Sequence, residues 1–193
     1  MIKIGIIGDI GSGKSFIAKQ FGSPVFNADK EVSKIYNNNK KCYLILKKKL
    51  PEYIFSFPIK KKELIRAILK SQNNLKKIVK IVHPFVKLKM VHFFKKNKNK
   101  KFLILDIPLL LENRLKKKNY ILIFVSAKKK DIQKRLKKRP NYNKQIFNMF
   151  KKLQLPLEIK KKKSNFIIKN NFKITYAKKS VKIIKNKILN INS

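Results

Sequence analysis

The stretch Gly8-Asp9-Ile10-Gly11-Ser12-Gly13-Lys14-Ser15 fits the pattern G-x-x-x-x-G-K-[ST]. It follows an apolar, β-branched segment over residues 1–7, typical of a buried strand, and it precedes helical periodicity over residues 13–22. Glycines in such a turn let successive backbone N–H groups converge on phosphate oxygens, and the helix that follows adds the positive potential of its N-terminal end. The motif and its strand-to-helix context therefore predict a phosphate-binding loop, or P-loop.

Each position of this loop has an expected task. Lys14 is expected to bridge the outer phosphates of ATP, and Ser15 to bind Mg²⁺ through its hydroxyl oxygen. Phe16 can offer only its backbone N–H group at the start of the helix. The other residues expected to surround the phosphates of ATP are Gly8, Gly11, Ser12 and Gly13.

Acidic residues are scarce, nine in the whole chain, so the position of each is informative. A P-loop needs a second Mg²⁺ contact, commonly a carboxylate at the end of an apolar strand, and Asp106 follows the apolar run 102–105. The alternative for Asp106 is a structural cap of the turn before Pro108. Asp9 lies within the loop itself, where a carboxylate repels phosphate unless its side chain points outward.

The chain is strongly basic, because 51 Lys and Arg against nine Asp and Glu give a formal charge of +42 over 193 residues. Such a charge attracts polyanions, yet only four of the basic residues are Arg, the residue that bidentate phosphate recognition favours. Lys, Ile and Asn, which have A/T-rich codons, make up about half of the chain, and the lysines are scattered through every segment. Compositional bias explains the lysines, and we expect no specific nucleic-acid partner beyond non-specific binding of polyanions.

The remaining composition predicts a soluble cytoplasmic protein. The lone Cys42 can form no internal disulfide, and the absence of a cysteine cluster gives no zinc site. No stretch approaches the roughly 20 apolar residues that a membrane span needs, so we expect no membrane partner. With 44% hydrophobic residues the chain can build a core of its own, and a monomer is favoured.

Hydrophobic patterning along the chain predicts an α/β fold. Further strands are expected over residues 24–27, 102–105, 120–125 and 166–168, and helices over 128–138, 143–153 and 176–189. Residues 30–98 are mostly helical, with breaks near Pro51, Pro58 and Pro84. Five strands joined by helical crossovers imply a mainly parallel sheet with a helical insertion after the second strand.

A P-loop alone is compatible with small-molecule kinases, GTPases and nucleic-acid motors. The chain is short for a motor core and has no N-K-x-D motif for guanine, so a small-molecule kinase is favoured. Beyond the P-loop, the order of several short motifs resembles the dephospho-coenzyme A kinase family over residues 4 to 171. These motifs are Asn27-Ala28-Asp29, His83-Pro84, Pro108-Leu109-Leu110-Leu111-Glu112, Arg135-Leu136-Lys137-Lys138-Arg139, and Gln154-Leu155-Pro156 followed by Asn170.

The resemblance implies a fold and an activity. The P-loop core would comprise residues 1–28, 98–127 and 164–193, a helical coenzyme A domain residues 29–97, and a helical lid residues 128–163. The implied reaction transfers the γ-phosphate of ATP, with Mg²⁺, to the ribose 3′-hydroxyl of dephospho-coenzyme A. This is the last step of coenzyme A synthesis.

The resemblance also implies roles for individual residues. Asp29 would accept a hydrogen bond from the attacking hydroxyl as general base or orienter, with a helix N-cap for the segment starting at Lys30 as the alternative. Arg135 and Arg139, four apart on one helix face, would reach the ATP phosphates, unless they form only a solvated face. Asn170 would contact adenine.

On the substrate side, the resemblance implies contacts from His83, expected at the start of a helix with Pro84 in its first turn. Departures from the family pattern affect this side: Asn27 replaces an acid, and Ser33 replaces an Arg whose charge Lys34 can supply. Pro140 replaces an acid after the second lid Arg. The further residues expected to bind or shape the substrate site are Pro108, Leu109 and Glu112.

Two other classes of function stay open from the sequence. Another small-molecule P-loop kinase would share the P-loop and Asp106 without needing the His83-Pro84 pair. A nucleic-acid-associated protein would bind through its lysines, with a regulatory or vestigial P-loop and a salt-sensitive affinity. A decayed kinase that retains the fold is the third alternative.

Overall fold

The computed structural model describes residues 1–108, 120–138 and 142–191 and forms two compact units. The first unit comprises Met1–Asn27, Asn97–Tyr142 and Lys151–Ser193, and the second comprises Ala28–Lys96 and Asn143–Phe150. The segment expected as a lid, residues 128–163, is thus shared between the two units, and its role as a lid stays a prediction.

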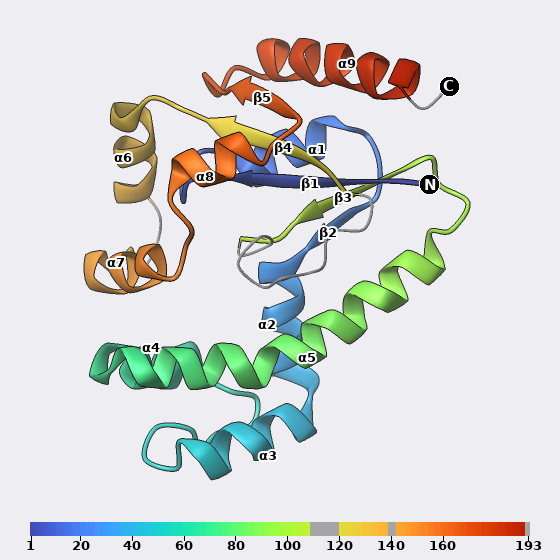
Figure 1. Ribbon diagram of the computed structural model, residues 1–193. Helices are drawn as coiled ribbons and strands as arrows, with labels where there is room; N and C mark the ends of the chain where they lie inside the picture. Colours follow the sequence, from blue (N-terminus) through green and yellow to red (C-terminus); the bar gives the residue numbers. More distant parts are fainter. Residues whose placement is uncertain (109–119, 139–141, 192–193) are drawn as a thin grey trace. The chain divides into compact units, whose positions relative to one another are not determined.

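A five-stranded parallel sheet forms the centre of the first unit (Figure 1). The strand order is β2-β3-β1-β4-β5, and every neighbouring pair is parallel, which confirms the predicted fold class. Each strand starts and ends within two residues of its predicted bounds. The strands are β1 (Ile2–Gly8), β2 (Val25–Asn27), β3 (Phe102–Asp106), β4 (Tyr120–Ser126) and β5 (Phe166–Lys169).

The register of the sheet decides where the polar residues gather. Asn27, the last residue of β2, pairs with Asp106, the last residue of β3, and Asp106 in turn pairs with Ile6 of β1. Because the strands are parallel, their carboxyl ends meet at one edge of the sheet, where ligands of α/β proteins bind. Gly8, which ends β1, opens the P-loop at this same edge.

Two helices pack together against one face of this sheet and complete the core on that side. α1 (Lys14–Gln20) contributes Ile17 and Ala18, and α9 (Ile174–Ile191) contributes Ala177, Val181 and Ile188. These side chains pack with the central β-branched residues of the strands in one buried cluster. Among its described residues, this unit also contains α6 (Lys129–Lys137) and α8 (Leu157–Lys162).

The sequence does not predict α8, although the helix is part of the structure. Its six residues are Lys-rich, and the one that is buried is Lys160, whose Nζ donates to Gln154 Oε1 at 2.8 Å. A helix whose buried position is occupied by lysine shows no apolar periodicity. Hydrophobic patterning therefore has no signal by which to detect it.

The second unit is helical, as predicted for the insertion after the second strand. It contains α2 (Ala28–Asn38), α3 (Lys40–Lys49), α4 (Lys61–Lys70), α5 (Gln72–Lys96) and most of α7 (Lys144–Lys152). The breaks expected near Pro51 and Pro58 are confirmed, because α3 ends before them and α4 begins after them. Within the described parts of the chain, no helix combines the length and the apolar character needed to cross a membrane.

The break predicted at Pro84 is wrong. Pro84 lies inside the 25-residue α5, so His83 is in the middle of a helix and not at its start. An internal proline costs about 3 kcal/mol, because it removes one backbone hydrogen bond and its ring crowds the preceding turn. Leu75, Ile78 and Met90 are buried on both sides of this position, and their packing outweighs that local cost.

Glu63 anchors the loop between α3 and α4. It is 1% exposed, and its carboxylate accepts hydrogen bonds from the backbone N–H groups of Phe55 at 3.0 Å and Ser56 at 3.2 Å, and from the Ser56 hydroxyl. Burial alone raises the pKa of this carboxyl, but these bonds and the nearby Lys60 outweigh it and hold the pKa below its usual value. The loop therefore depends on an ionised Glu63.

We expect Glu63→Gln to destabilise the protein by about 1–3 kcal/mol at neutral pH, because the charged acceptor of three hydrogen bonds is lost. The depressed pKa means that ionised Glu63 contributes its full stabilisation above the unfolded pKa of about 4.3, and that this contribution is lost progressively as the pH falls from there through the lower folded pKa. Urea unfolding of both proteins at pH 7 and pH 3 measures this change. The exposed Glu52→Gln is the control, and a difference that does not shrink at pH 3 would contradict the assignment.

Candidate nucleotide site

The loop between β1 and α1 has a backbone that glycine alone adopts easily. Gly11 and Gly13 have φ angles of 87° and 92°, in the region that side chains disfavour. A Cβ atom on Gly11 would lie 3.0 Å from the Ile132 side chain, and one on Gly13 would lie 2.2 Å from Asn170 Nδ2. The glycines thus allow the tight turn of the loop and also let the side chains of Ile132 and Asn170 pack closely against it.

The two charged residues of the loop are held by its own backbone. Lys14 Nζ donates to the carbonyl oxygens of Asp9 at 2.7 Å and Gly8 at 3.3 Å, so its ammonium group lies against the loop. The Asp9 carboxylate accepts a hydrogen bond from the Ile10 N–H at 2.7 Å. This local hydrogen bond holds the carboxylate of Asp9, whose negative charge would otherwise repel a phosphate ligand.

Ser12 has a polar atom suited to a ligand. Its side chain is fully buried, and its hydroxyl oxygen has no hydrogen-bond partner among the described residues. Buried polar groups are nearly always satisfied, and an unpartnered hydroxyl inside a phosphate-binding loop can donate to an anion. The loop thus offers a free donor in addition to its backbone N–H groups.

Three elements of the first unit meet at the carboxylate of Asp106. Asp106 Oδ2 accepts hydrogen bonds from the Ser15 hydroxyl at 2.5 Å and from Asn27 Nδ2 at 2.7 Å. Asp106 is 4% exposed, at the end of β3, whereas Ser15 is exposed at the start of α1. The carboxylate therefore faces the P-loop helix, which favours the metal role predicted from sequence over a cap of the turn before Pro108.

The donor set around Asp106 fits a hard divalent cation. Ser15 and Asp106 offer adjacent oxygen atoms, the ligand type that Mg²⁺ prefers, and Mg²⁺ completes its shell with water and substrate phosphate. The described residues contain no group of three or more His, Cys, Asp or Glu side chains that could hold a metal ion. A cation at Asp106 would therefore need water and substrate phosphate as further ligands. From the sequence, Asn27 is noted only as the replacement of an acid in the family pattern. Its hydrogen bond to Asp106 forms because the ends of β2 and β3 pair in the sheet.

Asn170 is buried beside the P-loop, and the adenine contact that the family resemblance implies for it stays a prediction. Its side chain is 3% exposed, Nδ2 donates to the Ser12 carbonyl at 2.9 Å, and Oδ1 accepts from the Phe172 N–H at 2.9 Å. Its backbone N–H donates to Ser126 O at 2.7 Å. The amide group thus ties the P-loop to the segment after β5.

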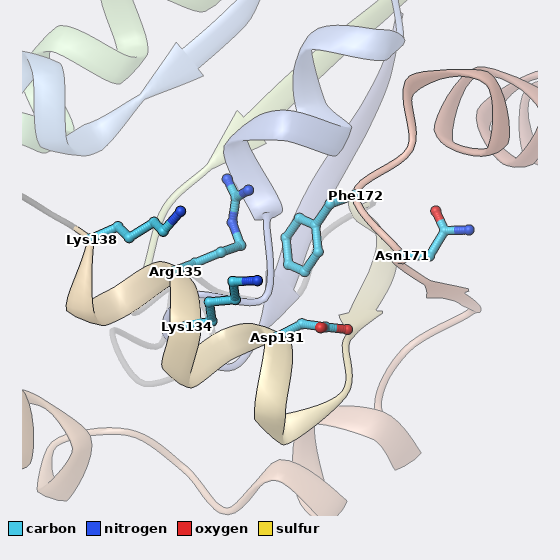
Figure 2. Close-up of a pocket in the computed structure, with 6 residues that line it drawn as sticks. All are labelled: Asp131, Lys134, Arg135, Lys138, Asn171 and Phe172. Carbon is cyan, nitrogen blue, oxygen red and sulfur yellow. The ribbon is translucent and has the colours of Figure 1, made fainter.

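A cavity of about 300 Å³ lies between α6 and the segment that follows β5. In Figure 2 the Arg135 side chain rises from α6 beside the Phe172 ring, with Arg135 Cζ 4.2 Å from the ring centroid. Phe172 is absent from the sequence prediction, because a single aromatic residue in a Lys-rich segment has no distinguishing pattern. The residues that line the cavity are Asp131, Lys134, Arg135, Lys138, Asn171 and Phe172.

The predicted substrate residues lie mainly in the second unit. Asp29 is exposed in the first turn of α2, which begins at Ala28, so the alternative in which Asp29 caps a helix starting at Lys30 is wrong. Lys34 is exposed on the same helix and pairs with Glu31 at 2.7 Å.

Other predicted residues are placed along the chain as follows. His83 is half-buried within α5, and Pro108 is half-buried just beyond β3. Three predicted residues, Leu109, Glu112 and Arg139, lie outside the described residues. Their roles stay predictions.

A parallel sheet of this strand order, with a glycine-rich loop between its central strand and the next helix, defines the P-loop class of nucleotide-binding proteins. The dephospho-CoA kinase family model matches residues 2–175. The dephospho-CoA kinase of Wolbachia pipientis wMel is 33% identical over 195 residues, which covers 98% of this chain and 99% of that protein. The chain belongs to the dephospho-CoA kinase family, and it is thus an ATP-using kinase.

Solved structures share the fold. The crystal structure of TT1252 from Thermus thermophilus aligns with a TM-score of 0.74 and 25% identity over 96% of this chain and 97% of that one. The dephospho-CoA kinase from Campylobacter jejuni aligns with a TM-score of 0.62 and 23% identity over 99% and 98% of the two chains. The fold and the family assignment therefore agree.

We expect Gly13→Ala to weaken ADP binding at least about tenfold and to destabilise the protein by about 2–4 kcal/mol. The added Cβ meets Asn170 Nδ2 at 2.2 Å and Phe172 Cε1 at 2.8 Å, in a backbone conformation that alanine disfavours. Calorimetric titration and thermal unfolding measure the two effects.

Gly22→Ala is the matched control. Its φ of 60° also disfavours alanine, but a Cβ at Gly22 meets nothing within 4 Å. We expect only the conformational cost of about 1–2 kcal/mol and an unchanged affinity for ADP. Equal losses of ADP affinity in the two variants would show that the close packing at Gly13 is unimportant.

Proposed function

We propose that the chain phosphorylates the ribose 3′-hydroxyl of dephospho-coenzyme A with ATP, the last step of coenzyme A synthesis. The observation that carries this proposal is the bond between Ser15 and Asp106 beside the P-loop, in a chain that belongs to the dephospho-CoA kinase family. The two oxygen atoms are of the type that Mg²⁺ prefers, and a P-loop Ser or Thr together with an Asp commonly holds the Mg²⁺ that bridges the β- and γ-phosphates, which supports the proposal.

Binding of ATP rests on the first unit. The backbone N–H groups of the loop and the Ser12 hydroxyl would donate to phosphate oxygens, and Lys14 would exchange its carbonyl contacts for the outer phosphates. Mg²⁺, held by Ser15 and Asp106, would neutralise charge on the phosphates. Arg135, which lines the cavity next to the loop, would add a guanidinium group for the same oxygens.

Phosphoryl transfer forms a bond from the 3′-oxygen of the acceptor to the γ-phosphorus and breaks the bond from that phosphorus to the β,γ-bridging oxygen, so that ADP leaves. The hydroxyl proton would pass to the carboxylate of Asp29, two residues along the chain from Asn27. Positive charge from Lys14 and Arg135 would stabilise the phosphoryl group as it moves. The chain's own contribution is thus positioning and electrostatics.

The substrate side of the proposal rests on the family resemblance. Asp29, Lys34 and His83 on the helical unit, together with Pro108, would contact dephospho-coenzyme A. The high positive charge of the chain favours such a polyanionic substrate. We expect a monomer that acts in the cytoplasm, with no specific nucleic-acid partner.

A coupled ADP-release assay with ATP, Mg²⁺ and dephospho-coenzyme A tests the proposal. We expect Asp29→Asn to lower kcat by about 10²–10⁴-fold, the usual contribution of a positioned general base. Lys14→Ala should lower kcat/KM by at least about 10²-fold, because a preorganised charge on the phosphates is removed. The exposed Lys19→Ala on α1 and Glu158→Gln on α8 are matched controls that should keep wild-type rates.

The outcomes separate the alternatives. Turnover that requires dephospho-coenzyme A and is lost in both site variants supports the proposal and the two roles. ATP binding by a folded protein without turnover of dephospho-coenzyme A would overturn the acceptor and favour another small-molecule kinase or a decayed one. Full activity of Asp29→Asn would remove that residue from the chemistry.

A further inference from the structure

Phe172 has an unusual backbone conformation next to the P-loop. Its φ is 62°, which makes it the non-glycine residue with positive φ among those that the structure describes. A bulky side chain adopts this left-handed conformation at an energetic cost, so the surrounding structure must hold it there. The hydrogen bond from the Phe172 N–H to Asn170 Oδ1 at 2.9 Å provides that hold.

The ring of Phe172 contacts two parts of the nucleotide site. Its edge lies against Gly13, since a Cβ atom built on that glycine falls 2.8 Å from Phe172 Cε1. Its face lies under the guanidinium group of Arg135, with Cζ 4.2 Å from the ring centroid (Figure 2). This distance is well inside the range of a cation–π interaction.

The helix that carries Arg135 is itself fixed on the P-loop. Ile132 and Leu136 of α6 are buried, and both lie within 3.3 Å of the position that a Cβ of Gly11 would take. Positions three and four apart share one face of a helix, so these contacts turn the Arg135 side of α6 toward the loop. Arg135 itself is exposed, and its long side chain has many rotamers unless something selects one.

We propose that Asn170 and Phe172 are positioning residues for Arg135 and the P-loop. Asn170 joins the Ser12 carbonyl to the Phe172 N–H, and the Phe172 ring holds the guanidinium of Arg135 beside Gly13. A group held in place before ATP binds loses less conformational freedom on binding, so ATP affinity increases. The inference rests on the proposed function in one respect, the contact of Arg135 with ATP phosphates.

A double-mutant cycle on nucleotide affinity tests this coupling without the acceptor. We expect Phe172→Leu to weaken ATP binding about threefold to tenfold, since the leucine keeps apolar bulk but removes the aromatic face. In the Arg135→Ala background the same substitution should change the affinity by less than about twofold. Calorimetric titration of ATP with Mg²⁺ into the four proteins measures the cycle. Independent, multiplicative losses in the double variant would overturn the proposal.

Further variants separate positioning from simple structural support. Phe172→Tyr keeps the ring face and should retain wild-type affinity, whereas Tyr176→Leu removes an exposed aromatic of α9 and should have no effect. Phe172→Gly removes the ring together with the backbone strain, so it replaces Phe172→Leu if the leucine variant does not fold. A loss of ATP affinity in Phe172→Tyr as large as in Phe172→Leu would contradict the cation–π role.

Asn170 is tested through the same nucleotide affinity. Asn170→Asp keeps an acceptor for the Phe172 N–H but loses the donor to the Ser12 carbonyl, and Asn170→Ala loses both. We expect weaker ATP binding in both variants, with the larger loss in Asn170→Ala, and an unchanged KM for dephospho-coenzyme A. Wild-type ATP affinity in Asn170→Ala would remove this residue from the proposal.

The two proposals fail in different ways. A protein that binds ATP with the expected coupling but does not turn over dephospho-coenzyme A refutes the proposed acceptor and leaves the inference standing. A protein with full turnover and no coupling between Phe172 and Arg135 refutes the inference alone.

Discussion

The hydrogen bond between Ser15 and Asp106 is the interaction on which the nucleotide site depends, because it joins the end of β3 to the first turn of α1 across 91 residues of chain. The parallel register of the sheet makes this possible by bringing the carboxyl ends of β1, β2 and β3 to one edge. Asn27 uses the same edge to donate to Asp106, so a neutral side chain orients the acid where a second carboxylate would repel it.

A second set of contacts supports the P-loop from the segment after β5, which is distant from the loop in the sequence. Asn170 reaches the Ser12 carbonyl from the segment after β5, and Gly13 has no room for a side chain because that amide and the Phe172 ring lie against it. Ser12 and Gly13 therefore contact residues about 160 positions away in the sequence. A phosphate cradle that is prearranged in this way avoids the cost of ordering its N–H groups when ATP binds.

The excess of lysine shapes the surface without dictating the fold. Most lysines are exposed, and the core cluster of the first unit is built from Ile, Val, Phe and Ala on the strands and on α1 and α9. Lys160 is an exception to this division between an apolar core and a lysine-rich surface, because it is buried and its ammonium group donates to Gln154. A buried lysine needs such a partner, because an unpaired charge inside the protein is costly.

The amino-acid sequence by itself determined the class of protein, the five strands, the P-loop and the acid that ends β3, because these depend on local patterns: apolar runs, glycine spacing and an acid after a strand. It misplaced the break at Pro84, since packing over a 25-residue helix outweighs a local proline cost. Only the tertiary structure decided that Asn170 supports Ser12, that Phe172 lies under Arg135 and that Asn27 donates to Asp106. These contacts join residues 37 to 158 positions apart, and no local pattern records which distant side chain will meet which.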